Sequence, residues 1–190
     1  DGAGAGGLLD SIRRVKESCC YVALDFEREM RISRATTHLM RRFALPDGTV
    51  VSLAAERFLA PEILFRPEIL DLEHPGIAEM VFAAAATAPI DHRRALFGSI
   101  VLSGGGTMLP GFSSRIQKDL QTLYDSRIGK GATLLGAPTI EVHDAPNRKH
   151  LAFTGGAVLG DLMKNQTDFW ISRHEYFEDP ERALARCSVV

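Results

Sequence analysis

The chain has 190 residues, of which 45% are hydrophobic and 24% charged, and its formal net charge at pH 7 is −2. This composition is ordinary for a globular protein with one core or two small ones, and the balanced charge argues against a dedicated nucleic-acid binder. No stretch approaches the roughly 20 consecutive apolar residues of a membrane-spanning helix. The cysteines, Cys19, Cys20 and Cys187, are odd in number and lack metal-ligand spacing, which favours a reduced, intracellular compartment.

The first quarter of the chain predicts a helix, an extended segment and a hairpin. Residues 1–7 are rich in glycine and alanine and are expected to be flexible. Apolar residues at helical spacing follow over residues 8–18, and residues 21–26 are expected to be extended. Pro-Asp-Gly at residues 46–48 is strong turn chemistry and predicts a hairpin over residues 43–53.

Helices are expected in the next part of the chain. Two short ones are predicted over residues 54–58 and 61–65, and a longer one over residues 77–87. The apolar face expected for the longer helix consists of Ile77, Met80, Val81 and Ala84.

The most informative stretch follows at residues 100–111, where an apolar run ends in Gly104, Gly105 and Gly106. It predicts a buried strand over residues 100–102, a turn without side chains, and then a helix to about residue 125, with Pro110 in its first turn. Such a turn lets a ligand lie against backbone N–H groups, so it suits a nucleotide and equally a plain tight turn. The residues of this helix expected to point inward are Phe112, Ile116, Leu120 and Leu123.

The remainder mixes strand and helix signals, which indicates an α/β or α+β architecture. The elements expected here are a glycine-rich connection over 126–138, a strand over 139–143, a helix over 155–163 and short charged helical turns over 172–186.

A nucleotide site needs apolar faces for the base, acceptors for the ribose hydroxyls and backbone donors near the phosphates. The three glycines supply bare backbone, Glu17 is a candidate ribose acceptor, and Lys149 can lay its aliphatic stem along a base. Each has a plainer interpretation, since Lys16-Glu17 and Lys149 are also typical of a solvated surface. Met108 and Leu109 are equally typical of a core.

No catalytic or metal-binding constellation can be recognised beside these residues. The six histidines are scattered, and none forms an i, i+4 pair with a third ligand. Ser103 precedes the glycines, but neither a Ser-His-Asp order nor a G-x-S-x-G turn surrounds it.

Several stretches, in order along the chain, resemble the actin family. Val-Leu-Ser-Gly-Gly-Gly-Thr-Met-Leu-Pro-Gly (101–111) resembles its adenosine loop. The other matching stretches are 16–26, 45–48, 56–65, 148–156 and 170–176, so the resemblance runs from about residue 12 to the end. It implies an α/β fold, the carboxyl-terminal half of the actin, sugar kinase and Hsp70-like ATPase fold. The large lobe would have its outer part at 1–72 and its inner part, with the adenosine loop, at 73–150, and residues 151–190 would return to the small lobe.

The resemblance also implies a nucleotide site and its limits. Family residues that match Lys16, Glu17, Gly105 and Lys149 line ATP or ADP, and the loop residues Gly104, Gly106, Met108 and Leu109 are carried over with them. The family usually has tyrosine at Leu109, and losing that ring removes about 1 kcal/mol of stacking. The hairpins that clamp the phosphates, the Mg²⁺ ligands and the hydrolytic residues of the family match nothing in this chain. It is therefore expected to hold only the adenosine part and not to act as an enzyme.

Within the family, the long connection at 123–131 and the segments 161–164 and 168–170 resemble an actin-related protein of the complex that nucleates branched actin filaments. That implies an ATP-binding structural subunit, cytoplasmic and cytoskeletal, with actin and the other subunits as partners and neither nucleic acid nor a membrane span. A partner groove would include Leu159, Leu162 and Phe169, which fit a core equally well. Residues 21–30 are closer to conventional actin. The alternatives are an actin-like filament protein, a chromatin-associated relative and a truncated ATPase of the superfamily.

Overall fold

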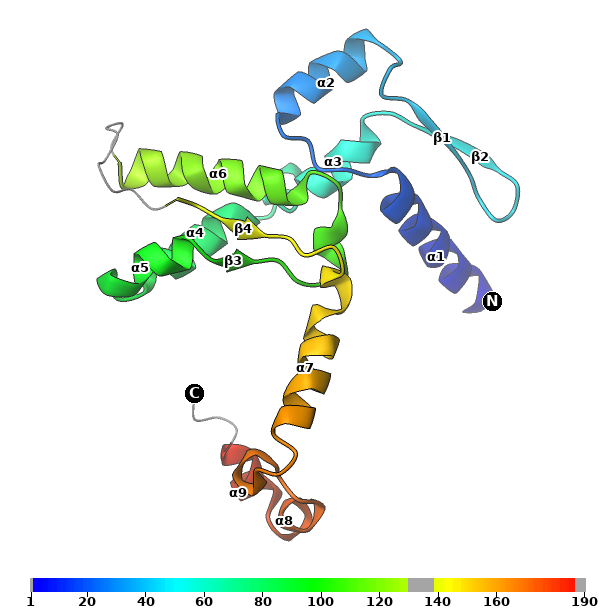
Figure 1. Cartoon of the computed structure of the whole chain (residues 1–190). Helices are drawn as coiled ribbons and strands as arrows, with labels where there is room; N and C mark the ends of the chain where they lie inside the picture. Colours follow the sequence, from blue (N-terminus) through cyan, green and yellow to red (C-terminus); the bar gives the residue numbers. More distant parts are fainter. Residues whose placement is uncertain (1, 130–138, 187–190) are drawn as a thin grey trace. The chain divides into compact units, whose positions relative to one another are not determined.

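The computed structural model describes residues 2–129 and 139–186 (Figure 1). They belong to two compact units, Asp1–Lys149 and His150–Val190, which are described separately. No helix within the described ranges is long and apolar enough to cross a membrane. Of the glycine-rich connection predicted over 126–138, residues 126 and 127 are helical instead, and residues 130–138 lie outside the described residues, as does Cys187.

The first unit combines helices with two small sheets. Its helices are α1 (Gly2–Cys19), α2 (Phe26–Ala35), α3 (Glu56–Glu62), α4 (Ile77–Thr87), α5 (Ile90–Phe97) and α6 (Phe112–Arg127). Its strands are β1 (Arg41–Ala44), β2 (Val50–Leu53), β3 (Ile100–Val101) and β4 (Val142–His143). Short 3₁₀ turns are η1 (Pro67–Leu70), η2 (Gly105–Met108) and η3 (Arg148–His150), the last of which crosses the boundary between the units.

The predicted hairpin is confirmed. β1 and β2 pair in antiparallel register, from Arg41 opposite Leu53 to Ala44 opposite Val50. The backbone N–H of Leu45 donates to the carbonyl of Thr49 at 2.8 Å and closes the turn. The turn chemistry is local, so the sequence alone could specify it.

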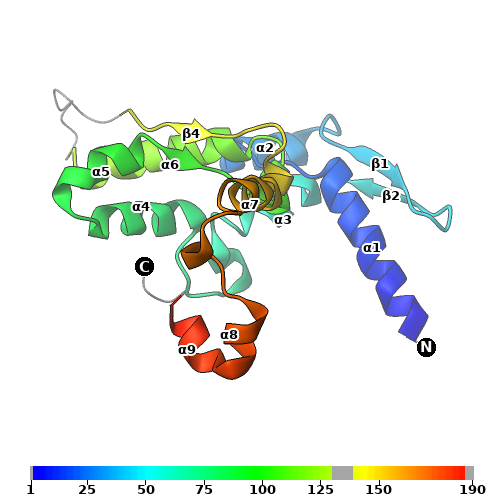
Figure 2. The same cartoon turned by 60° about the horizontal axis from the view of Figure 1, so that its bottom comes forward.

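The second sheet is a βαβ unit. β3 and β4 pair in parallel, with Ile100 opposite Val142, and α6 lies between them in the chain. A parallel pair requires such a crossover. α4 packs along α6 (Figure 2), and Gln117 of α6 donates to the carbonyl of Ile140 at 3.0 Å.

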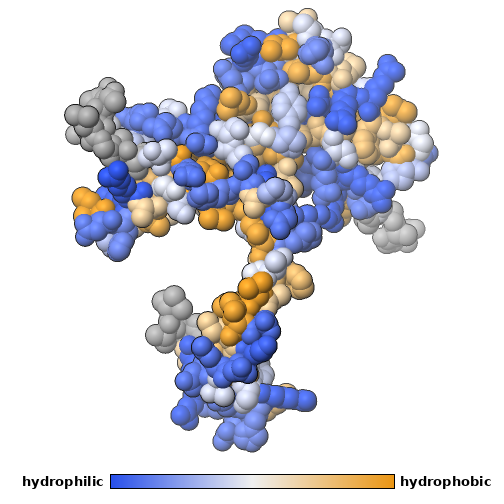
Figure 3. Space-filling view, in the orientation of Figure 1, coloured by the Kyte–Doolittle hydropathy of each residue, from blue (hydrophilic) through white to orange (hydrophobic). Residues whose placement is uncertain are grey.

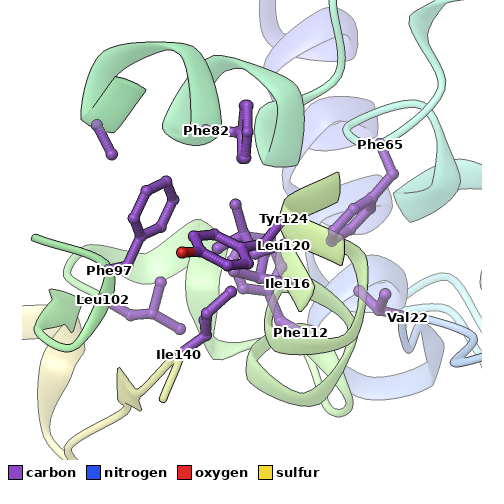
Figure 4. Packing of buried hydrophobic residues seen from close by; sticks show 11 residues of the cluster. Val22, Phe65, Phe82, Phe97, Leu102, Phe112, Ile116, Leu120, Tyr124 and Ile140 are labelled. Atoms are coloured by element: carbon purple, nitrogen blue, oxygen red, sulfur yellow. The ribbon is translucent and has the colours of Figure 1, made fainter. Parts of the chain in front are cut away.

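The core of the first unit is built around α6 (Figure 4). Phe112, Ile116 and Leu120 are buried, as predicted, and Leu123 is partly buried. Tyr124 extends this i, i+4 row and meets the ring of Phe97 edge-on, with 5.4 Å between the ring centroids. The cluster is completed by Val22, Phe65, Phe82, Ala85, Leu102 and Ile140.

Several predicted elements differ from the structure near the amino end. α1 begins at Gly2 rather than at residue 8, so residues 2–7 are helical; a helix extends readily once its first turn has formed. The segment 21–26 is irregular, and Phe26 already begins α2, which was not predicted. Asp25 caps α2 by accepting from the backbone N–H of Arg28 at 3.0 Å.

Other differences follow from packing. One helix, α3, replaces the two predicted over 54–58 and 61–65, and α5 was missed. α4 has the predicted bounds, but Met80 and Ala84 are exposed. Ala78, Phe82 and Ala85 are buried instead, because Phe82 enters the core against Phe97. The strand predicted over 139–143 is confined to β4.

The second unit consists of α7 (Leu151–Leu162), η4 (Thr167–Phe169), α8 (Arg173–Glu178) and α9 (Pro180–Ala185). α7 begins four residues earlier than predicted. The short charged helices are confirmed: Ser172 and Glu175 form a capping box for α8, and Asp179 caps α9. Apolar side chains cover much of the visible surface of α7 (Figure 3).

Candidate nucleotide-binding site

A cavity of about 650 Å³ lies in the first unit. Its walls are the end of α1, the face of α3, and the η2 loop together with Lys149. The lining residues are Arg13, Lys16, Glu17, Ala60, Pro61, Leu64, Gly105, Gly106, Met108, Leu109 and Lys149. This size is in the usual range for small-molecule sites, about 300–1,000 Å³.

All but one of the residues predicted for the adenosine site line this cavity. The exception is Gly104, which shapes the loop instead. It has φ +92° and ψ 156°, a conformation that side chains strongly disfavour. Its backbone N–H donates to the carbonyl of Arg148 at 2.9 Å, so Gly104 ties the loop to the segment that carries Lys149.

The path from β3 to α6 differs from the predicted one. A 3₁₀ turn, η2, follows Gly104, and α6 begins only at Phe112 with Gly111 as its N-cap residue. Pro110 therefore precedes the helix rather than occupying its first turn. Its carbonyl accepts from the backbone N–H of Val22 at 2.8 Å, which anchors the loop to the segment after α1.

The polar wall carries three cations and one carboxylate. Arg13 donates from Nε to Glu17 Oε1 at 3.1 Å, one helical turn away. This hydrogen bond, together with the charges of Arg13, Lys149 and Lys16, holds the pKa of Glu17 below its usual value of 4.5. Glu17 is therefore ionised at neutral pH and can accept hydrogen bonds from a pair of hydroxyls.

The apolar wall suits a flat ring. Pro61, Leu64 and Ala60 come from α3 and the residues just after it, and Met108 and Leu109 from the loop. Lys149 lies next to Gly105: a Cβ placed on Gly105 would be 3.7 Å from Lys149 Cγ and 3.9 Å from Cε. Bare backbone and an aliphatic stem thus lie side by side in the cavity wall, and both offer flat contact surface.

Sequence reasoning missed part of this lining. Arg13 could have been found, because it lies four residues before Glu17 on the same helix. Ala60 and Pro61 of α3 also line the cavity, but their place there depends on tertiary packing and could not be predicted from the local sequence.

A buried ion pair joins α3, which carries one wall of the cavity, to α6. Arg115 of α6 bonds both carboxylate oxygens of Glu62 in α3, at 2.8 and 2.9 Å, and Glu62 is fully buried. The guanidinium also donates to the carbonyl of Ala23 at 2.8 Å and to Asp119 at 2.7 Å. Burial alone would lower the pKa of Arg115, but the hydrogen bonds to Glu62 and Asp119 raise it. α3, α6 and the segment after α1 are thereby fixed to one another.

A second arginine secures the end of α1. Arg57 donates to the carbonyl of Cys19 at 2.8 Å and to that of Leu39 at 2.6 Å. Cys19 and Cys20 are buried free thiols, and burial raises the pKa of Cys20. Across residues 2–129 and 139–186, no three histidine, cysteine or acidic side chains are grouped so that they could hold a metal ion.

The residues predicted for a partner groove lie in the second unit. Leu159 and Leu162 are on α7, with 42% and 69% of their surfaces exposed, and Phe169 ends η4 with 47% exposed. Phe169 packs edge-on against Trp170, with 5.4 Å between the ring centroids. None of the three is a core residue of its own unit.

Comparison with known proteins shows the family. The family described as Actin matches residues 9–188. The chain therefore belongs to the actin family, and the predicted family and fold class are confirmed.

Its similar relatives carry the name Actin-related protein 2. The protein from Acanthamoeba castellanii is 43% identical over 180 residues, that from Arabidopsis thaliana 42% over 181, and that from Oryza sativa subsp. japonica 41% over 180. These alignments cover 94–95% of this chain and 46% of each relative. The chain thus spans about half the length of the relatives it matches, and within the family it is similar to Actin-related protein 2.

Proposed function

We propose that this chain provides the adenosine-binding part of an actin-related protein, a structural subunit of the complex that nucleates branched actin filaments. One observation carries the nucleotide part of the proposal: Glu17, Gly105 and Lys149, far apart in the sequence, line a single cavity. The identity of about 42% to Actin-related protein 2 supports the subtype.

In this proposal the adenine lies against the backbone of Gly105 and the stem of Lys149. The ribose hydroxyls donate to the ionised carboxylate of Glu17. Pro61 and Met108 supply apolar contacts around the base. Leu109 offers apolar surface but no ring to stack on, which lowers the expected affinity.

The chain is proposed to bind nucleotide without hydrolysing it. Hydrolysis requires an activated water and stabilisation of the charge on the phosphates. The side chains around the cavity supply cations and an acceptor for hydroxyl groups. They do not match the phosphate-clamping hairpins and hydrolytic residues of the family. The nucleotide then acts as a structural ligand, stabilising the walls that it joins.

Calorimetric titration of the purified chain with adenosine and with Mg-ATP tests this proposal. Because only the adenosine part is held, the two dissociation constants should agree within about tenfold, or 1.4 kcal/mol. Glu17→Gln should weaken adenosine binding by about tenfold, the usual effect of losing one charge-assisted hydrogen bond. Glu79→Gln is the matched control, because Glu79 forms a similarly exposed ion pair with Arg127 away from the cavity. If adenosine does not bind, or if both variants bind alike, the proposal is wrong.

For the role in filament nucleation, we propose that Leu159, Leu162 and Phe169 contact a partner. Large apolar residues gathered on an exposed surface are typical of protein interfaces. In a reconstituted nucleating complex that contains this chain, Leu162→Asp should reduce the rate of branched actin assembly. It should leave adenosine binding by the chain unchanged.

Leu184→Asp is the control for this assay, since Leu184 is a similarly exposed leucine on α9. Equal rates for the two variants would contradict the partner role. A pull-down with the tagged chain tests its partners. Recovery of chromatin-remodelling subunits alone would favour the chromatin-associated alternative. A cytoplasmic, cytoskeletal location follows from the same proposal and is checked by imaging the tagged protein.

A further inference from the structure

Arg148, the neighbour of Lys149, points away from solvent and bonds two loops. Its surface is only 9% exposed. Nη2 donates to the carbonyl of Thr107 at 2.8 Å, and Nε lies 3.2 Å from the hydroxyl of the same residue. Nη1 donates to the carbonyls of Asp144 and Ala145 at 3.1 and 3.2 Å. One guanidinium thus joins the η2 loop to the segment before η3.

These two loops carry adjacent parts of the cavity wall. Thr107 belongs to η2, the turn that begins at Gly105, and the 144–148 segment leads directly to Lys149. The main chain of Arg148 makes the same connection, since its carbonyl accepts from the N–H of Gly104 at 2.9 Å. Thr107 in turn donates from its hydroxyl to the carbonyl of Gly104 at 2.8 Å. The spacing between Gly105 and the Lys149 stem therefore depends on Arg148.

We infer that Arg148 is a positioning residue for the adenosine site, an inference that rests on the proposed function. It does not line the cavity, and it acts through Thr107. Its acceptors are carbonyl and hydroxyl oxygens of loops, whereas Arg115 joins two helices beside the core. Removing Arg148 should loosen the Gly105–Met108 turn and leave the core formed by α6 intact.

Lysine should not replace Arg148. A guanidinium presents donors in a rigid planar fork, while an ammonium has its three donors on one atom. A lysine side chain at this position retains the charge, but its one ammonium nitrogen replaces the three guanidinium nitrogens that bond Thr107, Asp144 and Ala145. If Arg148 only fills space or balances charge, Arg148→Lys should bind adenosine as the wild type does. If Arg148 positions the loop, Arg148→Lys should bind adenosine more weakly.

The test compares Arg148→Lys and Arg148→Gln with Arg93→Gln in the purified chain. Arg93 is a suitable control because it too donates to a main-chain carbonyl, that of Ala88, at 2.8 Å between α4 and α5. Two quantities are measured: hydrogen exchange at the backbone amides of residues 104–109 without ligand, and the dissociation constant for adenosine. Circular dichroism confirms that each variant is folded, and Arg148→Lys decides the result if Arg148→Gln does not fold.

We expect Arg148→Lys to speed exchange in the loop and to weaken adenosine binding at least about tenfold, or 1.4 kcal/mol. Arg93→Gln should change neither quantity. Wild-type exchange and affinity in Arg148→Lys would overturn the inference. If the wild-type chain does not bind adenosine, the proposed function fails. The exchange measurement then still decides whether Arg148 positions the loop.

Discussion

Alanine substitutions at two adjacent glycines should have different effects: at Gly104 on the free energy of unfolding, and at Gly105 on adenosine binding. Gly104 has φ +92° and ψ 156° and no atom within 4 Å of an added Cβ. An alanine methyl there would contact nothing, but the backbone conformation is one that residues other than glycine rarely adopt. The expected loss is about 1–3 kcal/mol of unfolding free energy.

Gly105→Ala should weaken adenosine binding without lowering stability. Its φ is not in the left-handed region, and its new methyl would meet the Lys149 stem at ordinary contact distances of 3.7 and 3.9 Å. Stability should stay the same or rise by about 0.4–1 kcal/mol, because alanine restricts the unfolded chain. The methyl also takes up space in the cavity wall, where Gly105 and the Lys149 stem lie side by side. One such group in a binding pocket changes binding by about 1–3 kcal/mol, so the dissociation constant should rise about tenfold or more.

Urea denaturation gives the unfolding free energies, and calorimetric titration gives the adenosine affinities. Gly106→Ala is a further reference for stability alone, because an added Cβ there has nothing within 4 Å and its φ is ordinary, whereas Gly106 also lines the cavity. The reasoning is refuted if Gly105→Ala binds adenosine as tightly as the wild type. It is also refuted if Gly104→Ala unfolds at the wild-type urea concentration.

Three further predictions concern single side chains. Arg115→Met leaves Glu62 buried without its partner and should cost about 3–5 kcal/mol of stability in urea denaturation; a loss below about 1 kcal/mol would contradict a structural role for the pair. Burial, with a hydrogen bond to Glu29, raises the pKa of Tyr21 to about 12, above the unfolded value of about 10. Its contribution to stability is therefore complete below about pH 10 and is lost as the pH rises through 12, so Tyr21→Phe should lose less stability than the wild type between about pH 10 and pH 12; equal losses would show that Tyr21 does not contribute. Leu109→Tyr supplies a ring and should tighten adenosine binding by about 1 kcal/mol, whereas unchanged or weaker affinity in calorimetry would place the base elsewhere.

The elements that could be predicted from the sequence are those with local causes. The Pro-Asp-Gly turn specified its hairpin, and the apolar spacing of α4 and α6 gave both helices. α2 could not be found from apolar periodicity, because none of its residues is buried and charged side chains dominate it. Asp25, followed by acidic residues in the first turn, was the signal available for it. The face of α4 was misplaced because Phe82 is selected by contact with Phe97, which is remote in the sequence.

The candidate site shows the same division. The glycine loop is visible as a pattern, and its resemblance to a known family supplied Glu17 and Lys149. The contribution of α3 to the wall arises from the buried pair that joins it to α6. The different roles of Arg148 and Lys149 could not be read from the sequence either. The sequence shows only two adjacent cations. In the structure Arg148 bonds Thr107 of the loop, whereas Lys149 lines the cavity.

Photolabelling with 8-azidoadenosine, followed by mass spectrometry of the labelled peptides, tests most directly whether adenosine binds in this cavity. The label should fall within residues 13–17, 60–64 or 105–109, or on Lys149, and excess adenosine should suppress it. Labelling elsewhere, on the β1–β2 hairpin or α5 for example, or labelling that adenosine does not suppress, would contradict the assignment of this cavity as the nucleotide site.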